Sequence, residues 1–331
     1  MTARSLFSRR AMLSGLGATA AAGGLLAAGP GWAATSLKGG QVAGYYRFML
    51  GAFEITVLSD GSYTLPTNLL GTNVPREKVT DFLKANFLDP EQRVSHVNIP
   101  LINTGKELVL VDVGGGMNWM EGAGRLTDNL RASGYEPEDV DKVVISHAHP
   151  DHIWGLIDEF EEAPRFPNAD YVIASTEWDF WTTDKAKTTM PDMFQGFVVG
   201  AQSRLPQIAE KTTRIKPGAE VVPGIVTLDT PGHTEGHMSL AITSQGKSLL
   251  VTADTMTHPF ISFSHPGWWP RTDLDNEMAE KSRRKMLEMA ATDKHLALVY
   301  HVSFPGLGHV ARNGKAYRWV PATWQWDLGG G

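Results

Sequence analysis

A dense group of potential metal ligands lies in the middle of the chain. His147, His149, Asp151 and His152 fall within six residues, directly after the apolar segment 142–146. The alternation of a strand points His147 and His149 to one side, and a following turn lets Asp151 and His152 face a second point nearby. The chain has no cysteine, so imidazole and carboxylate are the side chains left to bind an ion such as zinc. The segment therefore predicts a metal site after a buried strand.

The spacing His-x-His-x-Asp-His resembles the signature of the metallo-β-lactamase superfamily. That resemblance implies three more ligands downstream, each after a strand, and His233, Asp254 and His301 match them. It also implies an α+β fold: an αβ/βα four-layer sandwich, with two mixed sheets packed face to face and helices outside. The cofactors it implies are two divalent metal ions, with zinc as the first choice for this ligand set.

The resemblance divides the seven ligands between the two ions. One ion would take His147, His149 and His233, the other would take Asp151, His152 and His301, and Asp254 would bridge them together with a water or hydroxide. Such a pair ionises the shared water and polarises a C=O or P=O oxygen of the substrate. Asp254 and Asp151 are accordingly the expected catalytic residues, and Asp254 could also accept the proton of the nucleophile.

Two nearby residues have less specific signals. Asp112 follows an apolar run and could orient a ligand imidazole by a hydrogen bond, or could be an ordinary aspartate at a strand end. His237 lies four residues after His233, and we expect it to support a ligand or pack in the core rather than bind metal.

Further segments resemble the methyl parathion hydrolase group of this superfamily. These segments are 44–47, 50–51, 53–56, 58–61, 103–105, 303–309, 317–318 and 320–321. The resemblance implies organophosphate triesters as substrates and a possible homodimer. By their neighbours, Trp119, Trp181 and Phe197 fall where aromatic residues of the substrate pocket are expected, and His258 could also reach the substrate.

The substrate prediction has alternatives, because segments 182–196 and 256–260 differ from that group. The first alternative is a lactonase, acting on acyl-homoserine or other lactones, or an aryl esterase, with phosphotriester hydrolysis as a side reaction. The same nucleophile would attack acyl and phosphoryl centres. A third alternative, from another class, is a non-catalytic metal-binding protein.

Local patterns predict the elements that must position these residues. Strands are expected at 45–50, 53–58, 97–102, 108–113, 142–146, 172–174 and 221–228, with a turn at 59–61. Segments 238–243 and 248–252 are expected to form a hairpin around Gly246, and 296–301 is the last expected strand. Helices are expected at 76–85, 122–133, 175–181 and 276–292. Residues 182–205 show no clear period and are expected to be irregular.

Residues 1–33 resemble a twin-arginine export signal. Arg9 and Arg10 precede an apolar, Ala/Gly-rich run over residues 11–28, and cleavage is expected after Ala33 or, as an alternative, after Ala34. The domain boundaries are therefore 1–33 for the signal and 34–331 for the hydrolase domain, and the mature protein is expected in the periplasm or secreted. The alternative is an uncleaved membrane anchor. After signal removal we expect no stable membrane insertion.

Composition limits the partners. The chain of 331 residues is 42% hydrophobic and 20% charged, with a formal net charge of -6. It therefore lacks the basic excess that binds nucleic acid. We expect the partner to be a small-molecule ester, lactone or phosphotriester.

Overall fold

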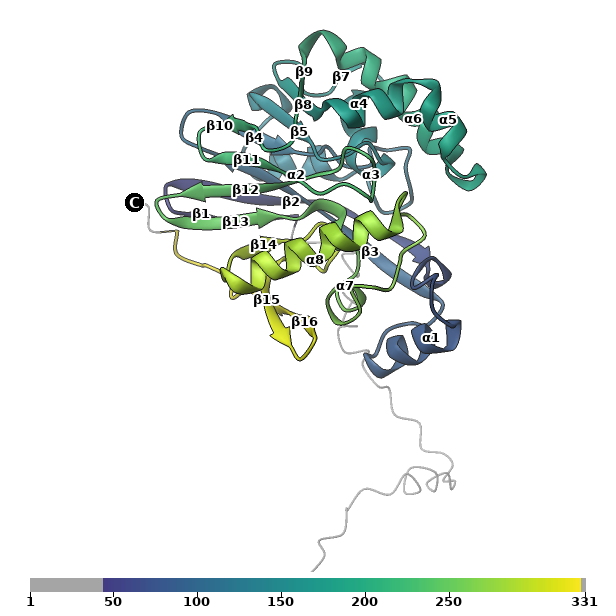
Figure 1. Cartoon of the computed structure of the whole chain (residues 1–331). Helices are drawn as coiled ribbons and strands as arrows, with labels where there is room; N and C mark the ends of the chain where they lie inside the picture. Colours follow the sequence, from purple (N-terminus) through teal and green to yellow (C-terminus); the bar gives the residue numbers. More distant parts are fainter. Residues whose placement is uncertain (1–43, 329–331) are drawn as a thin grey trace, which may run out of the picture. The chain divides into compact units, whose positions relative to one another are not determined.

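Residues 44–328 are the part of the chain that the computed structural model describes, and two seven-stranded sheets form its centre (Figure 1). In order across the first sheet, the strands are β1 (Tyr45–Leu50), β2 (Phe53–Pro66), β3 (Gln92–Asn103), β4 (Leu108–Val111), β5 (Lys142–Ile145), β8 (Asp170–Ala174) and β9 (Thr212–Ile215). Neighbours from β1 to β4 are antiparallel, and those from β4 to β9 are parallel. The first sheet is therefore mixed.

The second sheet is also mixed. Its strands, in order, are β10 (Glu220–Val222), β11 (Ile225–Asp229), β12 (Met238–Ser244), β13 (Lys247–Val251), β14 (Leu296–Leu298), β15 (Leu307–Asn313) and β16 (Ala316–Pro321). β13 and β14 are parallel, and the other neighbours are antiparallel. A short pair, β6 (Ile157–Asp158) and β7 (Ala163–Pro164), lies apart from both sheets.

Central strands are apolar on both faces because each face is covered. In β4, Val109 and Val111 pack into the core between the sheets, whereas Leu108 and Leu110 pack on the opposite face. β13 shows the same alternation, since Leu249 belongs to the core between the sheets and its neighbour Leu250 to a separate outer cluster. Successive side chains of a strand point to opposite faces, so an unbroken apolar run is typical of a strand that is buried on both faces.

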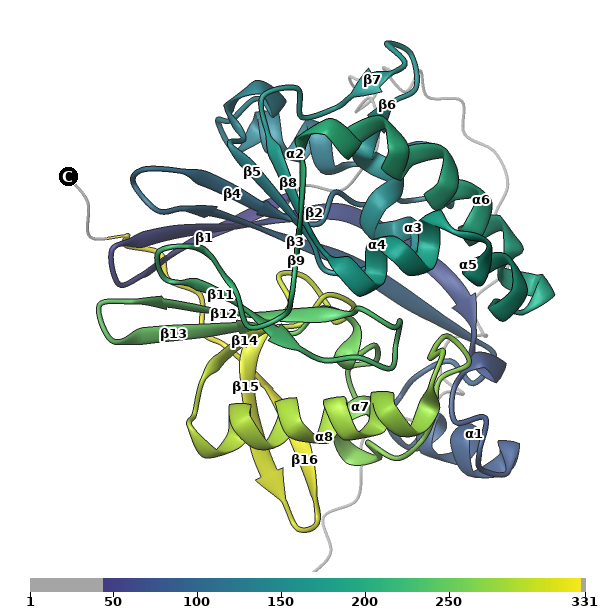
Figure 2. The same ribbon diagram turned by 45° about the horizontal axis from the view of Figure 1, so that its top comes forward.

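Helices cover the outer face of each sheet (Figure 2). α2 (Leu126–Ala132), α4 (Ser175–Thr182) and α6 (Gln195–Arg204) contribute buried side chains to the core of the first sheet, and α8 (Asn276–Thr292) contributes to the outer core of the second. The remaining α-helices are α1 (Arg76–Ala85), α3 (Pro150–Ile153), α5 (Asp184–Thr189) and α7 (Ile261–Ser264). Short 3-10 helices are η1 (Thr67–Leu69), η2 (Pro137–Asp139), η3 (Trp154–Leu156), η4 (Asp192–Phe194), η5 (Leu205–Lys211) and η6 (Ala253–Thr255). This layering confirms the predicted αβ/βα sandwich.

Some local predictions were wrong. Residues 182–205 contain α5 and α6 and are not irregular. In α6, Gly200 packs closely on the indole of Trp154, where a Cβ would clash. The expected turn at 59–61 is a register shift inside the long strand β2. Segment 221–228 is two strands, and the segment after residue 298 adds β15 and β16.

No helix within residues 44–328 combines the length and apolar character required to cross a bilayer. The predicted export signal at 1–33 lies outside the described residues.

Candidate metal centre

All seven predicted ligand residues come together at one edge of the sandwich. Because β11, β13 and β14 run in the same direction, the residues that follow them meet at the same edge of the second sheet, as do those after β4 and β5 in the first. The seven are all buried: His147, His149, Asp151, His152, His233, Asp254 and His301. Only the folded topology brings these segments, separated by up to about half the chain, into contact.

Two groups of three match the predicted division. The ligand atoms of His147, His149 and His233 lie within 4.8 Å of one another, and so do those of Asp151, His152 and His301. In the first group, Nδ1 of His149 faces Nε2 of His233 at 2.9 Å. In the second, Oδ2 of Asp151 lies 3.3 Å from Nε2 of His301.

Asp254 lies between the two groups. One carboxylate oxygen, Oδ2, is 3.3 Å from Nε2 of His233 and 3.1 Å from Nε2 of His301, and the other, Oδ1, is 3.3 Å from Nε2 of His152. The preceding residue, Ala253, has a φ of 43°, which is rare for a residue with a Cβ. Backbone strain therefore accompanies the turn that directs Asp254 into the centre.

The donor set fits divalent ions. Nε2 of His147, Nε2 of His152 and Oδ1 of Asp254 are buried and have no hydrogen-bond partner among the described residues. Unsatisfied buried polar atoms are rare in folded proteins and need a partner of another kind. Imidazole nitrogens and carboxylate oxygens are ligands of zinc and of similar ions, so the two groups are suited to hold two metal ions.

The charge state of the protein without metal is set by burial and by mutual contacts. Burial, together with the neighbouring histidines, holds the pKa values of His147 and His149 well below their ordinary value, so both rings are neutral in the metal-free protein. Burial opposes ionisation of Asp254, but His301 and His152 hold the pKa of its carboxyl well below the usual range. A carboxylate thus lies among imidazoles, and its anionic form suits a cation site.

Carboxylates outside the two groups orient the imidazoles. Asp112 accepts a hydrogen bond from Nδ1 of His152 at 2.8 Å, and Asp273 accepts one from Nδ1 of His233 at 2.8 Å. Nη2 of Arg283, in α8, donates to the other oxygen of Asp273 at 2.7 Å. Such partners fix which nitrogen of a histidine faces the metal. The prediction for Asp112 is consistent with this contact, whereas Asp273 and Arg283 carried no local signal.

Two tyrosines that the sequence analysis missed contact Asp151. The hydroxyl of Tyr63 donates to Oδ2 of Asp151 at 2.7 Å, and that of Tyr300 donates to the Asp151 backbone carbonyl at 2.8 Å. The Tyr300 ring also stacks on His152, with ring centroids 4.0 Å apart. Only adjacency to His301 could have indicated Tyr300.

Glu177, at the start of α4, joins two loops that carry histidine ligands: the loop with His147 and His149, and the loop with His233. Its carboxylate accepts hydrogen bonds from the backbone N–H of Ala148 and of Gly236, from the hydroxyl of Thr234 and from the indole of Trp181. Ala148 lies between two ligands, and Thr234 follows a third. Glu177 therefore fixes both loops from one buried point.

His237 lies beside the centre as a supporting residue. Its Nε2 accepts the backbone N–H of Asp254 at 3.1 Å, and burial lowers the pKa of His237 to about 3. The ring is thus neutral and engaged with the backbone of Asp254.

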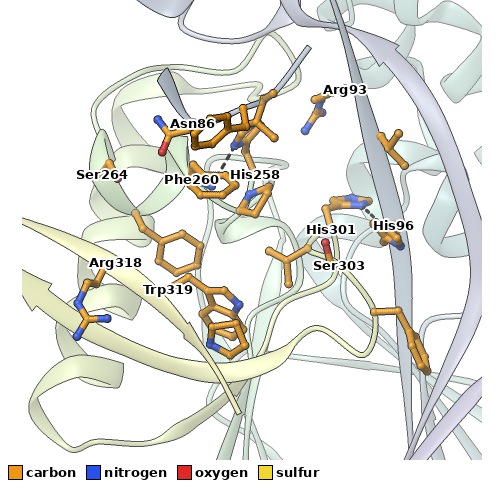
Figure 3. Close-up of a pocket in the computed structure, with 18 of the residues that line it drawn as sticks. Asn86, Arg93, His96, His258, Phe260, Ser264, His301, Ser303, Arg318 and Trp319 are labelled. Carbon is orange, nitrogen blue, oxygen red and sulfur yellow. Dashed lines mark hydrogen bonds between the residues drawn. The ribbon is translucent and has the colours of Figure 1, made fainter. Parts of the chain in front are cut away.

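The predicted pocket residues separate into two sets. Phe197 packs edge-on against His149 with centroids 5.4 Å apart, and Trp119 packs against Phe197 at 5.5 Å. Trp181 is fully buried beneath the same histidine. His258 instead lines a cavity of about 750 Å³ that also includes His301 (Figure 3). The three aromatic residues are not part of that cavity's lining.

Comparison with known proteins agrees with this geometry. Residues 93–294 match the sequence profile of the metallo-beta-lactamase superfamily. The chain is 29% identical over 178 residues to the N-acyl homoserine lactonase AiiA of Bacillus thuringiensis subsp. kurstaki, a match that covers 54% of this chain and 62% of the relative. The chain thus spans somewhat less than two thirds of the curated lactonases it matches.

Solved structures match over more of the chain. AidC, described as a dizinc quorum-quenching lactonase, is 29% identical with a TM-score of 0.79, over 85% of this chain and 98% of AidC. AbOPH, described as a hydrolase in the beta lactamase superfamily, is 30% identical with a TM-score of 0.80, over 86% of this chain and 100% of AbOPH.

Proposed function

This chain belongs to the metallo-beta-lactamase superfamily and is a metal-dependent hydrolase, and from this premise we propose that it hydrolyses lactones, including N-acyl homoserine lactones. The observation that carries the proposal is the pair of buried ligand groups joined by Asp254. The similarity to the dizinc lactonase AidC supports the choice of lactones and of zinc.

The chain's own residues account for the chemistry as follows. His147, His149 and His233 would hold one ion, Asp151, His152 and His301 the other, and Asp254 both. When bound, the ions supply a Lewis acid that activates water and polarises the carbonyl oxygen. Asp254 and Asp151 are the carboxylates that act at the reacting atoms: Asp254 stays anionic between the groups, and Tyr63 holds Asp151 in place.

Hydrolysis of organophosphate triesters, the first prediction from the sequence, remains a second candidate. AbOPH supports a hydrolase of this fold without specifying a substrate. The same centre can attack phosphoryl, lactone and aryl ester groups, so a direct comparison of substrates must decide.

A substrate panel tests the proposal. Zinc-loaded protein is assayed on N-decanoyl homoserine lactone, methyl parathion and p-nitrophenyl acetate, and we expect the highest kcat/KM on the lactone. A higher kcat/KM on methyl parathion would reject the lactonase proposal in favour of the phosphotriesterase.

Chelation should abolish all three activities, and readdition of zinc should restore them. Elemental analysis of the restored protein should give two zinc ions per chain.

We further propose export through the twin-arginine pathway and a homodimer. The proposal of export rests on Arg9 and Arg10 before the apolar run 11–28. Cell fractionation of the wild type against a variant with both arginines changed to lysine tests it, since the variant should stay in the cytoplasm.

Light scattering of the mature protein tests the dimer, which a monomer mass would exclude.

A further inference from the structure

The first half of α8 packs closely on the loop that carries His233. The backbone N–H of Asp275, the residue before the helix, donates to the carbonyl of Gly232 at 2.8 Å, and that of Leu274 donates to the carbonyl of His233 at 3.1 Å. Gly232 has a φ of 120°, and a Cβ there would lie 2.1 Å from the backbone nitrogen of Ala279 in the helix. The helix and the loop are therefore placed as one unit.

Arg283, on the buried face of α8, is one of the largest fully buried side chains among residues 44–328. Each of its three nitrogens donates one hydrogen bond. Nε donates to the carbonyl of Thr255 at 2.9 Å, Nη1 to the carbonyl of Pro266 at 2.9 Å, and Nη2 to the carboxylate of Asp273 at 2.7 Å. The guanidinium thus holds three separate points of the segment that leads from η6 to α8.

Two of these three contacts lead to predicted metal ligands. Thr255 directly follows Asp254, the carboxylate that lies between the two ligand groups. Asp273 uses its other oxygen to accept the Nδ1 proton of His233 at 2.8 Å. Arg283 is therefore one residue removed from Asp254 along the chain and one carboxylate removed from His233.

Attachment of α8 to the sheet does not by itself require a buried charge. Met286, Leu287 and Ala290 of the same helix pack in the outer core of the second sheet. Burial of an ion pair costs desolvation energy, and apolar side chains of similar volume are often at least as stabilising. A buried arginine whose ionic partner contacts a ligand histidine therefore indicates a role in the geometry of the centre.

We propose that Arg283 is a positioning residue that places two metal-holding residues at once: Asp254, through the backbone of Thr255, and His233, through Asp273. The inference rests on the ligand assignment given under the proposed function and goes beyond it. It predicts that the two ligand groups are coupled through α8, a helix that contributes no ligand, whichever ester is the substrate.

Two substitutions separate the two paths. Asp273→Asn removes the charge behind His233 and leaves the contact between Arg283 and Thr255. The affinity for one zinc ion should then fall by about 10- to 100-fold, while the other ion is held as in the wild type.

Arg283→Lys keeps the positive charge but replaces the planar fork with a single nitrogen. That nitrogen cannot hold Thr255 and Asp273 in place together. The affinities for both zinc ions should therefore fall by about tenfold or more, because Asp254 belongs to both groups.

Competition of the full-length, zinc-loaded protein with chelators of graded strength measures the two zinc affinities. Absorption spectra of the cobalt-loaded protein report the coordination geometry, and the spectrum of Arg283→Lys should differ from that of the wild type. The matched control is Arg284→Lys, at the next residue, whose side chain is 49% exposed and pairs with Glu280. It should retain both affinities and the spectrum.

Two results with folded Arg283→Lys would overturn the proposal. The first is a pair of zinc affinities and a cobalt spectrum equal to those of the wild type. The second is a loss of affinity confined to one ion, which would mean that Arg283 acts through Asp273 alone.

Hydrogen exchange of the wild type keeps the proposal testable should Arg283→Lys fail to fold. Because coupling is reciprocal, zinc must also stabilise the segment that influences its binding. Removal of zinc should speed amide exchange around Arg283 at least about tenfold more than in α1, whose buried residues belong to a different apolar cluster. An equal effect of zinc on the two helices would overturn the coupling.

Failure of the ligand assignment can be distinguished from failure of this inference. Fewer than two zinc ions per chain in the loaded wild type would reject the assignment, and the inference with it. Two ions in the wild type, with unchanged affinities in Arg283→Lys, would reject the role of Arg283 alone.

Discussion

The carboxylate of Asp254 approaches ligand nitrogens of both groups. Its oxygens lie 3.1–3.3 Å from imidazole nitrogens of His152, His233 and His301. Asp254→Ala should therefore lower both zinc occupancy and kcat/KM by at least about 100-fold, because one charge shared by two cations is lost. Elemental analysis of purified protein and steady-state kinetics measure the two effects.

The matched control for this change is Asp81→Ala, at an exposed aspartate of α1. It should retain zinc and activity. Full activity of Asp254→Ala would contradict the assignment of the bridge.

Asp112 acts on the centre through His152. It accepts the Nδ1 proton of His152 and also binds the hydroxyl and backbone N–H of Ser146. The φ of Asp112 is 64°, a conformation that asparagine tolerates. Asp112→Asn therefore removes the negative charge without changing the backbone conformation. We expect this variant to bind zinc about 10- to 100-fold more weakly, measured by competition with a chelating dye. Unchanged affinity would mean that the contact has no influence on the metal.

At the scale of elements, α4 positions two loops at once. The buried carboxylate of Glu177 accepts four hydrogen bonds, from both histidine loops and from its own helix. Glu177→Gln keeps the shape but turns an amide N–H toward donors. Each donor left unsatisfied should cost about 1–3 kcal/mol, so the free energy of unfolding in urea should fall, and zinc affinity with it.

Glu210→Gln, at an exposed position of η5, is the control and should leave both quantities unchanged. A stable Glu177→Gln variant with normal zinc affinity would show that the loops hold their positions without this contact.

At the scale of the whole molecule, the centre depends on the packing of one sheet on the other. Ligands come from both sheets, and the core between the sheets is continuous across their strands. Leu240, in β12, is fully buried in that core. Leu240→Ala should lower the free energy of unfolding by about 2–5 kcal/mol through loss of buried surface and formation of a cavity.

The control is Val199→Ala, in α6, whose valine is 68% exposed. It should change stability by less than about 0.5 kcal/mol. Urea unfolding of the metal-free protein measures both. A change below 1 kcal/mol in Leu240→Ala would indicate that the sheets do not pack as described.

The sequence by itself determined the ligand types, the order of the ligand segments and much of the secondary structure. The segment 147–152 holds four ligand residues close together, and helices 76–85 and 276–292 have the bounds expected from their patterns. These features depend on residues near one another in the chain, where spacing alone carries the physical information. Resemblance added the four-layer fold and the three distant ligands.

Only the tertiary structure decided which distant groups meet. Asp273 and Glu177 have no local motif. They matter because the fold places Asp273 against His233, and Glu177 against the loops that carry His147, His149 and His233. Gly200 of α6 packs on Trp154, and His258 faces a cavity that the predicted aromatic residues Trp119, Trp181 and Phe197 do not line. Such contacts arise between segments far apart in sequence, so local spacing does not specify them.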